Sequence, residues 1–332
     1  MGELWLHRSR GRVKQMTEQL TIALAQITPV WFDRAATLEK VCASVAEAAA
    51  NGAQLVAFGE ACVPGYPFWL EYSKVTDFNS PFHKHFHAEY VNQAVCIEDG
   101  HLNGLCETAR LHSISIYLGM IERPSDRGGK SLYASLVYID KDGVIRSVHR
   151  KLMPTYDERL TWSTGDGNGL RTHRLGAFTV GGLNCWENWM PLARTSLYAQ
   201  GEDLHVAVWP GSERNTRDIT RYIALESRSY VASVSCLMRK HDLQKNLPGM
   251  DTIIENSPEF LANGGSCIAG PSGEWIVEPF CGEEKLVVAE IDHRKVREER
   301  QNFDAVGHYS RPDVLELKVD RRRQTTAEFR DD

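Results

Sequence analysis

The sequence lacks a long apolar run. No stretch approaches the roughly 20 consecutive apolar residues that a helix needs to cross a bilayer, and residues 1–17 carry basic side chains without the apolar segment and cleavage site of a secretory signal. We therefore expect a cytoplasmic protein that does not associate with a membrane. We also expect residues 1–17 to form a flexible leader.

An excess of positive charge is missing as well. The 332 residues include 44 acidic side chains against 38 Lys and Arg, which leaves a net charge of −6 with His neutral. Proteins that hold nucleic acid by its phosphates depend on basic surfaces. The charge balance therefore argues against nucleic acid as a partner and favours chemistry on a small molecule.

Complete metal and phosphate motifs are also absent. The eight cysteines form no Cys-x-x-Cys pair, which argues against a zinc ribbon or a disulfide framework. The glycine-rich segment 164–169 follows no predicted strand and lacks the Lys-Ser/Thr of a phosphate loop. His83, His85 and His87 alternate, so they suit either a strand or, for two of them, one face of a helix, but no acid or Cys has the spacing of a known site. We expect neither a metal nor a cofactor.

What the sequence does contain is enough apolar material for a sizeable core. Hydrophobic residues make up 42% of the chain and charged residues 25%, without repeats, low-complexity tracts or a Pro/Ser-rich linker. The charged, aperiodic end of the chain has the character of a flexible tail. We predict one domain over residues 18–320 and a tail over residues 321–332.

Strands and helices alternate along the first two thirds of the chain. Turn sequences at 140–143 and 271–274 each join two apolar runs, as in antiparallel hairpins. This pattern predicts mixed sheets with helices outside, and two sheets packed face to face would accommodate the strands. Apolar, β-branched runs predict strands at 20–27, 55–58, 114–121, 132–139, 144–152, 179–183, 204–209, 231–237 and 286–291. Helical periodicity fits 35–50, capped by Asp33, part of 91–112, 192–200, 219–230 and 294–303.

Three predicted strands end at a reactive polar residue. Glu60 follows the run 55–58, Lys151 closes the run 144–152, and Cys185 follows the run 179–183. Strand ends are a usual place for a functional site. Taken singly, a strand-end acid or lysine is more often solvated, and a cysteine there is more often a small core residue.

Taken together, the three segments resemble the nitrilase superfamily of carbon-nitrogen hydrolases, and most closely its nitrilase branch. The resemblance lies in Glu60 with Val-Pro-Gly-Tyr-Pro at 63–67, in 150–159 (Arg-Lys-Leu-Met-Pro-Thr-Tyr-Asp-Glu-Arg), and in 184–194, which begins Asn-Cys-Trp-Glu-Asn. It implies an α+β fold, a four-layer αββα sandwich of two mixed sheets with outer helices, and no metal or cofactor. It also implies a homo-oligomer, from dimers to spirals, formed through 192–200, 219–230 and the C-terminal segment 307–313.

The same resemblance implies roles for individual residues. Cys185 would be the nucleophile, Glu60 the general base, Lys151 the cation that stabilises the anionic intermediate together with the backbone N–H of Trp186, and Glu158 a second glutamate that helps to position the site. A thiol is mostly protonated at neutral pH and needs such a base and a positive charge. Tyr66, Trp162, Trp186 and Trp209 would line the substrate pocket, or else pack in the core. Glu187 is expected to support the site from behind it.

The expected reaction is the hydrolysis of an organic nitrile to its carboxylic acid and ammonia through a covalent thioimidate on Cys185. Aromatic pocket residues would favour apolar aliphatic or aryl nitriles. An amidase or a cyanide hydrolase of the same superfamily is the near alternative, because the same residues can act on an amide. An inactive oligomeric scaffold is the alternative from another class. A Cys–His pair as in cysteine proteases would leave the Glu60 and Lys151 segments unexplained.

Overall fold

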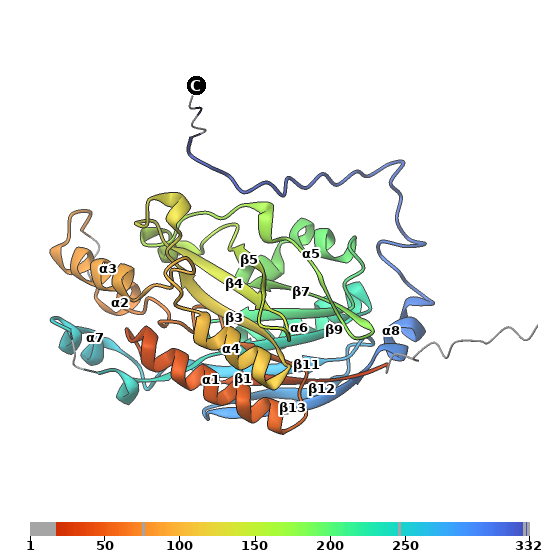
Figure 1. The fold of residues 1–332 in the computed structure, drawn as a ribbon, viewed down its shortest axis with the longest axis horizontal. Coiled ribbons are helices and arrows are strands. Elements are labelled where there is room, and N and C mark those ends of the chain that lie inside the picture. The colour runs from red at the N-terminus through yellow and green to blue at the C-terminus, as the bar shows by residue number, and fades with distance from the viewer. Residues whose placement is uncertain (1–17, 75–76, 245–246, 328–329, 331–332) are drawn as a thin grey trace, which may run out of the picture.

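The structure is a computed structural model that describes residues 18–74, 77–244, 247–327 and 330. The leader predicted at 1–17 lies outside the described residues. Residues 75–76, 245–246, 328–329 and 331–332 lie outside them as well. Two β-sheets lie face to face, with helices on both outer faces (Figure 1). No helix of the described part has the length and apolar character to cross a membrane.

The first sheet has the strand order β13-β1-β2-β3-β4-β5. Strands β1, β2 and β3 run parallel, and the other neighbours are antiparallel, so β5 points the same way as β2. Helices α1 and α4 pack their apolar faces on its outer side, and Asp33 caps α1 as predicted. The elements are β1 (Gln19–Gln26), α1 (Arg34–Ala50), β2 (Leu55–Phe58), α4 (Asn103–His112), β3 (Ser115–Glu122), β4 (Tyr133–Ile139), β5 (Ile145–Arg150) and β13 (Lys285–Asp292).

The second sheet has the order β10-β11-β9-β8-β7-β6, with β12 paired to β11. Strands β7, β8 and β9 run parallel, so both sheets place the ends of their parallel strands at one edge of the sandwich. Helices α5 and α6 cover the outer face. The elements are β6 (His173–Leu175), β7 (Phe178–Asn184), α5 (Pro191–Tyr198), β8 (Leu204–Trp209), α6 (Glu213–Ser227), β9 (Tyr230–Ser235), β10 (Leu237–Arg239), β11 (Phe260–Ala269) and β12 (Trp275–Cys281).

A continuous apolar layer holds the two sheets together. Side chains of β1 and β2, among them Leu20, Ile22 and Leu55, meet Val206 and Val208 of β8 in this layer. Alternate residues of a strand face opposite sides of a sheet, so each strand also supplies residues to the helix-covered face. The predicted four-layer αββα sandwich with two mixed sheets is confirmed.

Several boundaries differ from the predictions. The expected helix within 91–112 is divided: its first residues close α3 (Pro81–Gln93), which Ser80 caps, and α4 starts only at Asn103. The strand expected at 231–237 ends at Ser235, and Leu237 instead begins β10, where its backbone N–H donates to the carbonyl of Ile27. Two short helices were not predicted, namely α2 (Trp69–Tyr72) and α7 (Met250–Asn256). The helix expected at 294–303 is α8 (His293–Arg300), which ends three residues earlier.

Candidate active site

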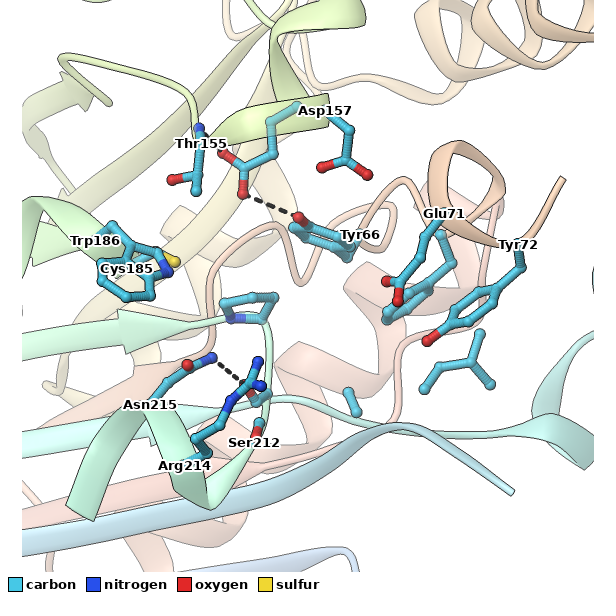
Figure 2. Close-up of a pocket in the computed structure, with 16 residues that line it drawn as sticks. Tyr66, Glu71, Tyr72, Thr155, Asp157, Cys185, Trp186, Ser212, Arg214 and Asn215 are labelled. Atoms are coloured by element: carbon cyan, nitrogen blue, oxygen red, sulfur yellow. Dashed lines mark hydrogen bonds between the residues drawn. The ribbon is translucent and has the colours of Figure 1, made fainter. Parts of the chain in front are cut away.

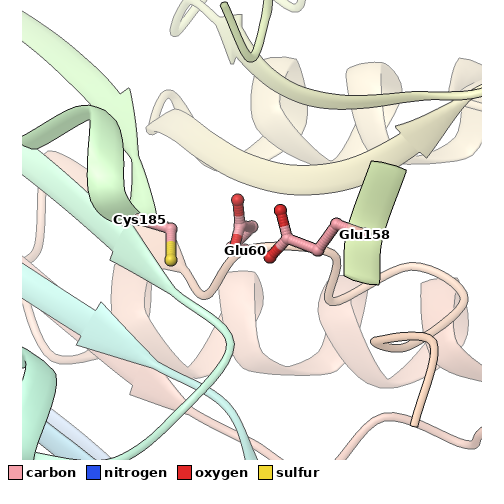
Figure 3. A group of neighbouring side chains, drawn as sticks. All are labelled: Glu60, Glu158 and Cys185. Atoms are coloured by element: carbon pink, nitrogen blue, oxygen red, sulfur yellow. The ribbon is translucent and has the colours of Figure 1, made fainter. Parts of the chain in front are cut away.

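The three strand-end residues converge between the two sheets. Glu60 lies just after β2, Lys151 just after β5 and Cys185 just after β7, and their relative exposures are 1%, 1% and 2%. The Cys185 sulfur and a carboxylate oxygen from each of Glu60 and Glu158 lie within 4.8 Å of one another (Figure 3). Strands β2, β5 and β7 all end at the same edge of the sandwich, so the residues that follow them share one site.

Lys151 is the centre of the charge arrangement. Its Nζ lies 2.8 Å from Glu60 Oε1 and 2.7 Å from Glu158 Oε2. The Glu158 carboxylate also accepts hydrogen bonds from the Tyr66 hydroxyl at 2.9 Å and from the Thr155 N–H at 2.6 Å. Glu60 Oε2, by contrast, has no hydrogen-bond partner within the described residues. Glu158 is therefore held by three partners, whereas Glu60 has a free oxygen for proton exchange.

The same group of side chains offers donor atoms that a metal ion would accept. The Lys151 ammonium, however, already lies between the Glu60 and Glu158 carboxylates. A cation placed among these oxygens would have to displace the ammonium or repel it at close range. The arrangement suits a proton-transfer and anion-binding site built around a lysine.

Burial shifts the protonation equilibria of these groups. It raises the pKa of Glu60 to about 7, although the Lys151 ammonium opposes this shift. Burial also raises the pKa of the Cys185 thiol well above its usual value, and Glu60 adds to the effect while Lys151 counteracts it. For Lys151 burial favours the neutral amine, but Cys185 and the two carboxylates outweigh it and raise the pKa. The site therefore holds a neutral thiol beside a carboxyl group that exchanges its proton near neutral pH.

A strained turn presents the sulfur. Cys185 has φ = +49°, a left-handed conformation that non-glycine residues seldom adopt, at the start of the 3₁₀ helix η4 (Cys185–Trp189). The Asn188 side chain donates a hydrogen bond to the Cys185 carbonyl at 2.9 Å and so supports this turn.

The turn that carries Glu60 is packed closely against β3. A Cβ on Gly119 of β3 would lie 2.1 Å from the carbonyl oxygen of Gly59, so β3 can pass this turn only with glycine at position 119.

A cavity of about 290 Å³ opens from the sulfur toward solvent. Figure 2 shows Cys185 and Trp186 at one end, Glu71 and Tyr72 at the other, and Arg214 reaching into the space from the start of α6. Asp157 completes a charged rim, and burial, followed by the nearby Glu158, raises its pKa. The mouth of the cavity is thus more polar than the aromatic residues of the sequence suggest.

The four predicted pocket aromatics divide into two groups. Tyr66 and Trp186 line the cavity, and Trp186 remains half exposed. Trp162 lies behind Tyr66, edge to face at 5.6 Å, with the Lys151 ammonium 5.4 Å from its ring. Trp209 is fully buried under α6 and donates to Ser233. The last two rings back the site from the core and are not part of the cavity wall that the described residues form.

The remaining candidates from the sequence lie elsewhere or act indirectly. His83 and His87 share a face of α3, where His87 contacts Thr161. The charged groups that influence the Cys185 thiol are Glu60, Lys151 and Glu158, with no histidine among these described neighbours. Arg214 and Asn215 were missed, although they follow β8 at the same edge, where the strand-end rule would have found them.

Comparison with known proteins agrees with this geometry. Residues 21–301 match the model of the family described as carbon-nitrogen hydrolase. The chain is 35% identical to "Nitrilase 2" of an unknown prokaryotic organism over 94% of this chain and 96% of that protein. It is 34% identical to an aliphatic nitrilase of Rhodococcus rhodochrous, covering 94% and 82%, and 34% identical to an arylacetonitrilase of Aspergillus niger, covering 92% and 90%.

Solved structures show the same fold at lower identity. A carbon-nitrogen hydrolase from Helicobacter pylori G27 superposes with a TM-score of 0.67 at 19% identity, covering 89% of this chain and 96% of that one. An amidase from Nesterenkonia sp. gives 0.62 at 18% identity, covering 89% and 98%. At these identities the likeness concerns the fold alone.

Proposed function

The chain belongs to the carbon-nitrogen hydrolase family, and on that premise we propose that it is a nitrilase, which hydrolyses an organic nitrile to the carboxylic acid and ammonia. The observation that carries the proposal is the buried contact of Lys151 with two carboxylates beside the Cys185 sulfur. The relatives of 32–35% identity bear nitrilase names along nearly the whole chain, whereas the amidases resemble it only in fold.

In the first step, the Cys185 sulfur attacks the nitrile carbon. Glu60 accepts the thiol proton through its free oxygen and passes it to the nitrile nitrogen, which leaves a covalent thioimidate. Negative charge builds up on that nitrogen during the attack, and we propose that the Lys151 ammonium and the backbone N–H of Trp186 stabilise it. A carboxyl group with pKa about 7 suits this exchange, because it gains and loses a proton with similar ease near neutral pH.

Water then replaces nitrogen. Addition of one water to the thioimidate gives a tetrahedral adduct, and transfer of a proton to its nitrogen allows the carbon-nitrogen bond to break with release of ammonia. A second water, deprotonated by Glu60, attacks the remaining thioester, which yields the carboxylic acid and restores the thiol. Two waters are consumed for each nitrile. Glu158, itself held by the Tyr66 hydroxyl, keeps the Lys151 ammonium in place.

The cavity also indicates the kind of nitrile. Tyr66, Phe68 and Trp186 suit an apolar portion near the reactive carbon, while Glu71, Asp157 and Arg214 surround the outer end. Charged side chains lose hydration when an apolar group is placed against them. We therefore propose that the preferred substrate carries a polar group at the end remote from its nitrile, in contrast to the purely apolar nitriles expected from the aromatic residues.

Ammonia release from matched substrates tests this function. We expect turnover of butyronitrile, phenylacetonitrile and 4-hydroxybutyronitrile, with the last giving a kcat/KM about tenfold higher, which corresponds to about 1.4 kcal/mol at the outer end of the cavity. The amide of each nitrile and free cyanide serve as comparison substrates. Faster turnover of the amides would indicate an amidase, cyanide alone would indicate a cyanide hydrolase, and no ammonia from any substrate would favour an inactive scaffold.

We further propose that the protein is a cytoplasmic homo-oligomer. Apolar side chains are exposed on η4, α5 and α6, namely Trp189, Leu192, Tyr222 and Leu225, where the family resemblance places a two-fold interface. The segment 307–313 is also exposed, including Tyr309. All eight cysteines are free thiols, as a reducing compartment maintains them. Light scattering should give a multiple of the 37.4 kDa chain mass, and a monomer at micromolar concentration would contradict the assembly.

A further inference from the structure

We propose that Glu187 is the residue that positions Cys185 and Lys151 relative to each other. This inference rests on the nitrilase function proposed above, since it concerns the same reacting groups. Glu187 lies two residues after Cys185 in η4 and is fully buried, 1% exposed, although it does not line the cavity formed by the described residues.

The Glu187 carboxylate joins segments from both sheets. One oxygen accepts a hydrogen bond from the backbone N–H of Leu152, the residue directly after Lys151 in the segment that follows β5 of the first sheet. The other accepts from the N–H of Asn184, the residue directly before Cys185 in the second sheet, at 2.9 Å. A single rigid side chain thereby fixes the backbone on either side of the gap between ammonium and sulfur.

A third contact holds the carboxylate itself. His149, which lies on β5 two residues before Lys151, places its Nε2 3.1 Å and 3.2 Å from the two Glu187 oxygens. Burial favours the protonated acid, but His149 and the two backbone N–H groups outweigh it, so the pKa of Glu187 is lowered. Glu187 therefore remains an acceptor-only carboxylate, which is what two convergent N–H donors require.

The spacing that this bridge sets matters for the chemistry. A misplacement of about 1 Å among reacting groups can lower a rate on the order of 100-fold. The Lys151 ammonium must reach the charge on the adduct, and it must also lower the proton affinity of the Cys185 thiol. If the bridge is lost, the adduct is held less well for cleavage of its carbon-nitrogen bond. In more of it the carbon-sulfur bond should break instead, which releases the amide and restores the Cys185 thiol.

A second buried carboxylate beside a histidine supplies a matched control. Asp203 is buried, its Oδ1 accepts a hydrogen bond from the backbone N–H of Thr179 at 2.7 Å, and its Oδ2 lies 2.8 Å from Nε2 of His293. Thr179 lies at the opposite end of β7 from Cys185, and the Asp203 side chain makes no hydrogen bond to the Lys151 segment among the described residues. Asp203→Asn therefore reproduces the loss of a buried carboxylate that accepts a backbone N–H, without loss of the bridge between the sheets.

The test compares Glu187→Gln, which keeps the size of the side chain, with Glu187→Asp, which keeps the charge but shortens the reach. Both should lower kcat by about 100-fold with KM changed little, and both should raise the amide fraction of the product. Alkylation of Cys185 by iodoacetamide should slow by about tenfold, as expected for a rise of one unit in the thiol pKa. Asp203→Asn should leave the amide fraction and the alkylation rate unchanged.

The readouts separate two kinds of failure. If folded Glu187→Asp or Glu187→Gln keeps the wild-type alkylation rate, the positioning role of Glu187 is wrong, whatever the substrate. If wild-type protein is alkylated rapidly at Cys185 but releases no ammonia from nitriles, the proposed function is wrong and the alkylation rates of the variants still decide the role of Glu187. Should Glu187→Gln not fold, Glu187→Asp alone decides it, because that variant retains the buried charge.

Discussion

Cys185→Ala should abolish nitrile turnover, with kcat lowered by at least about 10⁴-fold. Removing the nucleophile of a covalent mechanism removes both chemical steps, and losses on the order of 10⁶-fold are known for other enzymes of this type. The fold should tolerate alanine at position 185, because the thiol is a small side chain buried among apolar residues of β8 and α6. Ammonia release under saturating nitrile measures the effect.

A second buried cysteine provides the control for this variant. Cys267 lies in β11, fully buried, and its sulfur contacts the Thr220 hydroxyl at 3.5 Å rather than the Glu60 and Lys151 cluster. Cys267→Ala should therefore retain turnover. If Cys185→Ala kept more than about 1% of wild-type kcat while folded, the nucleophilic role of Cys185 would have to be abandoned.

Lys151→Met should lower both activity and stability. The methionine fills much of the same space but leaves the Glu60 and Glu158 carboxylates facing each other without the ammonium that now lies 2.8 Å and 2.7 Å from them. We expect kcat to fall by about 10²–10³-fold, as for loss of one anion-stabilising donor. The free energy of unfolding should fall by about 3–5 kcal/mol, because a buried charge has lost its partner.

The stability loss in Lys151→Met should depend on pH. Lys151 lowers the pKa of Glu60, so its removal raises this pKa further above the ordinary value of 4.5. A carboxyl group with a raised folded-state pKa stabilises the fold fully below its unfolded value, and this contribution is lost as the pH rises through the folded value. Urea denaturation should thus show a small difference from wild type at pH 4.5 and a large one above pH 7. A pH-independent difference would contradict the charge argument.

Lys141→Met is the matched control for these measurements. Lys141 lies in the turn between β4 and β5, is largely exposed and, among the described residues, pairs only with the neighbouring Asp142. Exposed ion pairs contribute little to stability. The variant should therefore keep wild-type turnover and stability, which separates the effect of the buried ammonium from the general effect of removing a lysine.

The sequence was informative where a strand ends at a reactive residue. Glu60, Lys151 and Cys185 follow short apolar runs, and parallel strands bring such ends to one edge of a sheet, so their convergence follows from local pattern and topology together. Mixed sheets with outer helices could be predicted for a similar reason, and the four-layer arrangement followed from the family resemblance. Helical and strand periodicities alternate, and each amphipathic element needs an apolar layer on which to pack.

Other features depend on contacts between distant segments and have no local signal. The Glu187 carboxylate bridges Leu152 and Asn184 only because β5 and β7 belong to facing sheets. Trp209 belongs to the core because α6 covers β8, although the family resemblance suggested the pocket. Arg214 reaches the cavity because it lies in the first turn of α6. This helix begins at Glu213, six residues before the start at 219 that the apolar periodicity predicted.

The central claim is that Cys185 bonds to the nitrile carbon while Glu60 and Lys151 assist. The most direct measurement is mass spectrometry of the intact protein, and then of its peptides, after rapid mixing with a nitrile and acid quenching within one turnover. The account predicts a transient adduct with the mass of the thioimidate or acyl thioester, located on the peptide that contains Cys185. Ammonia released at the full rate without any adduct on Cys185, or with the adduct on another of the eight cysteines, would contradict it.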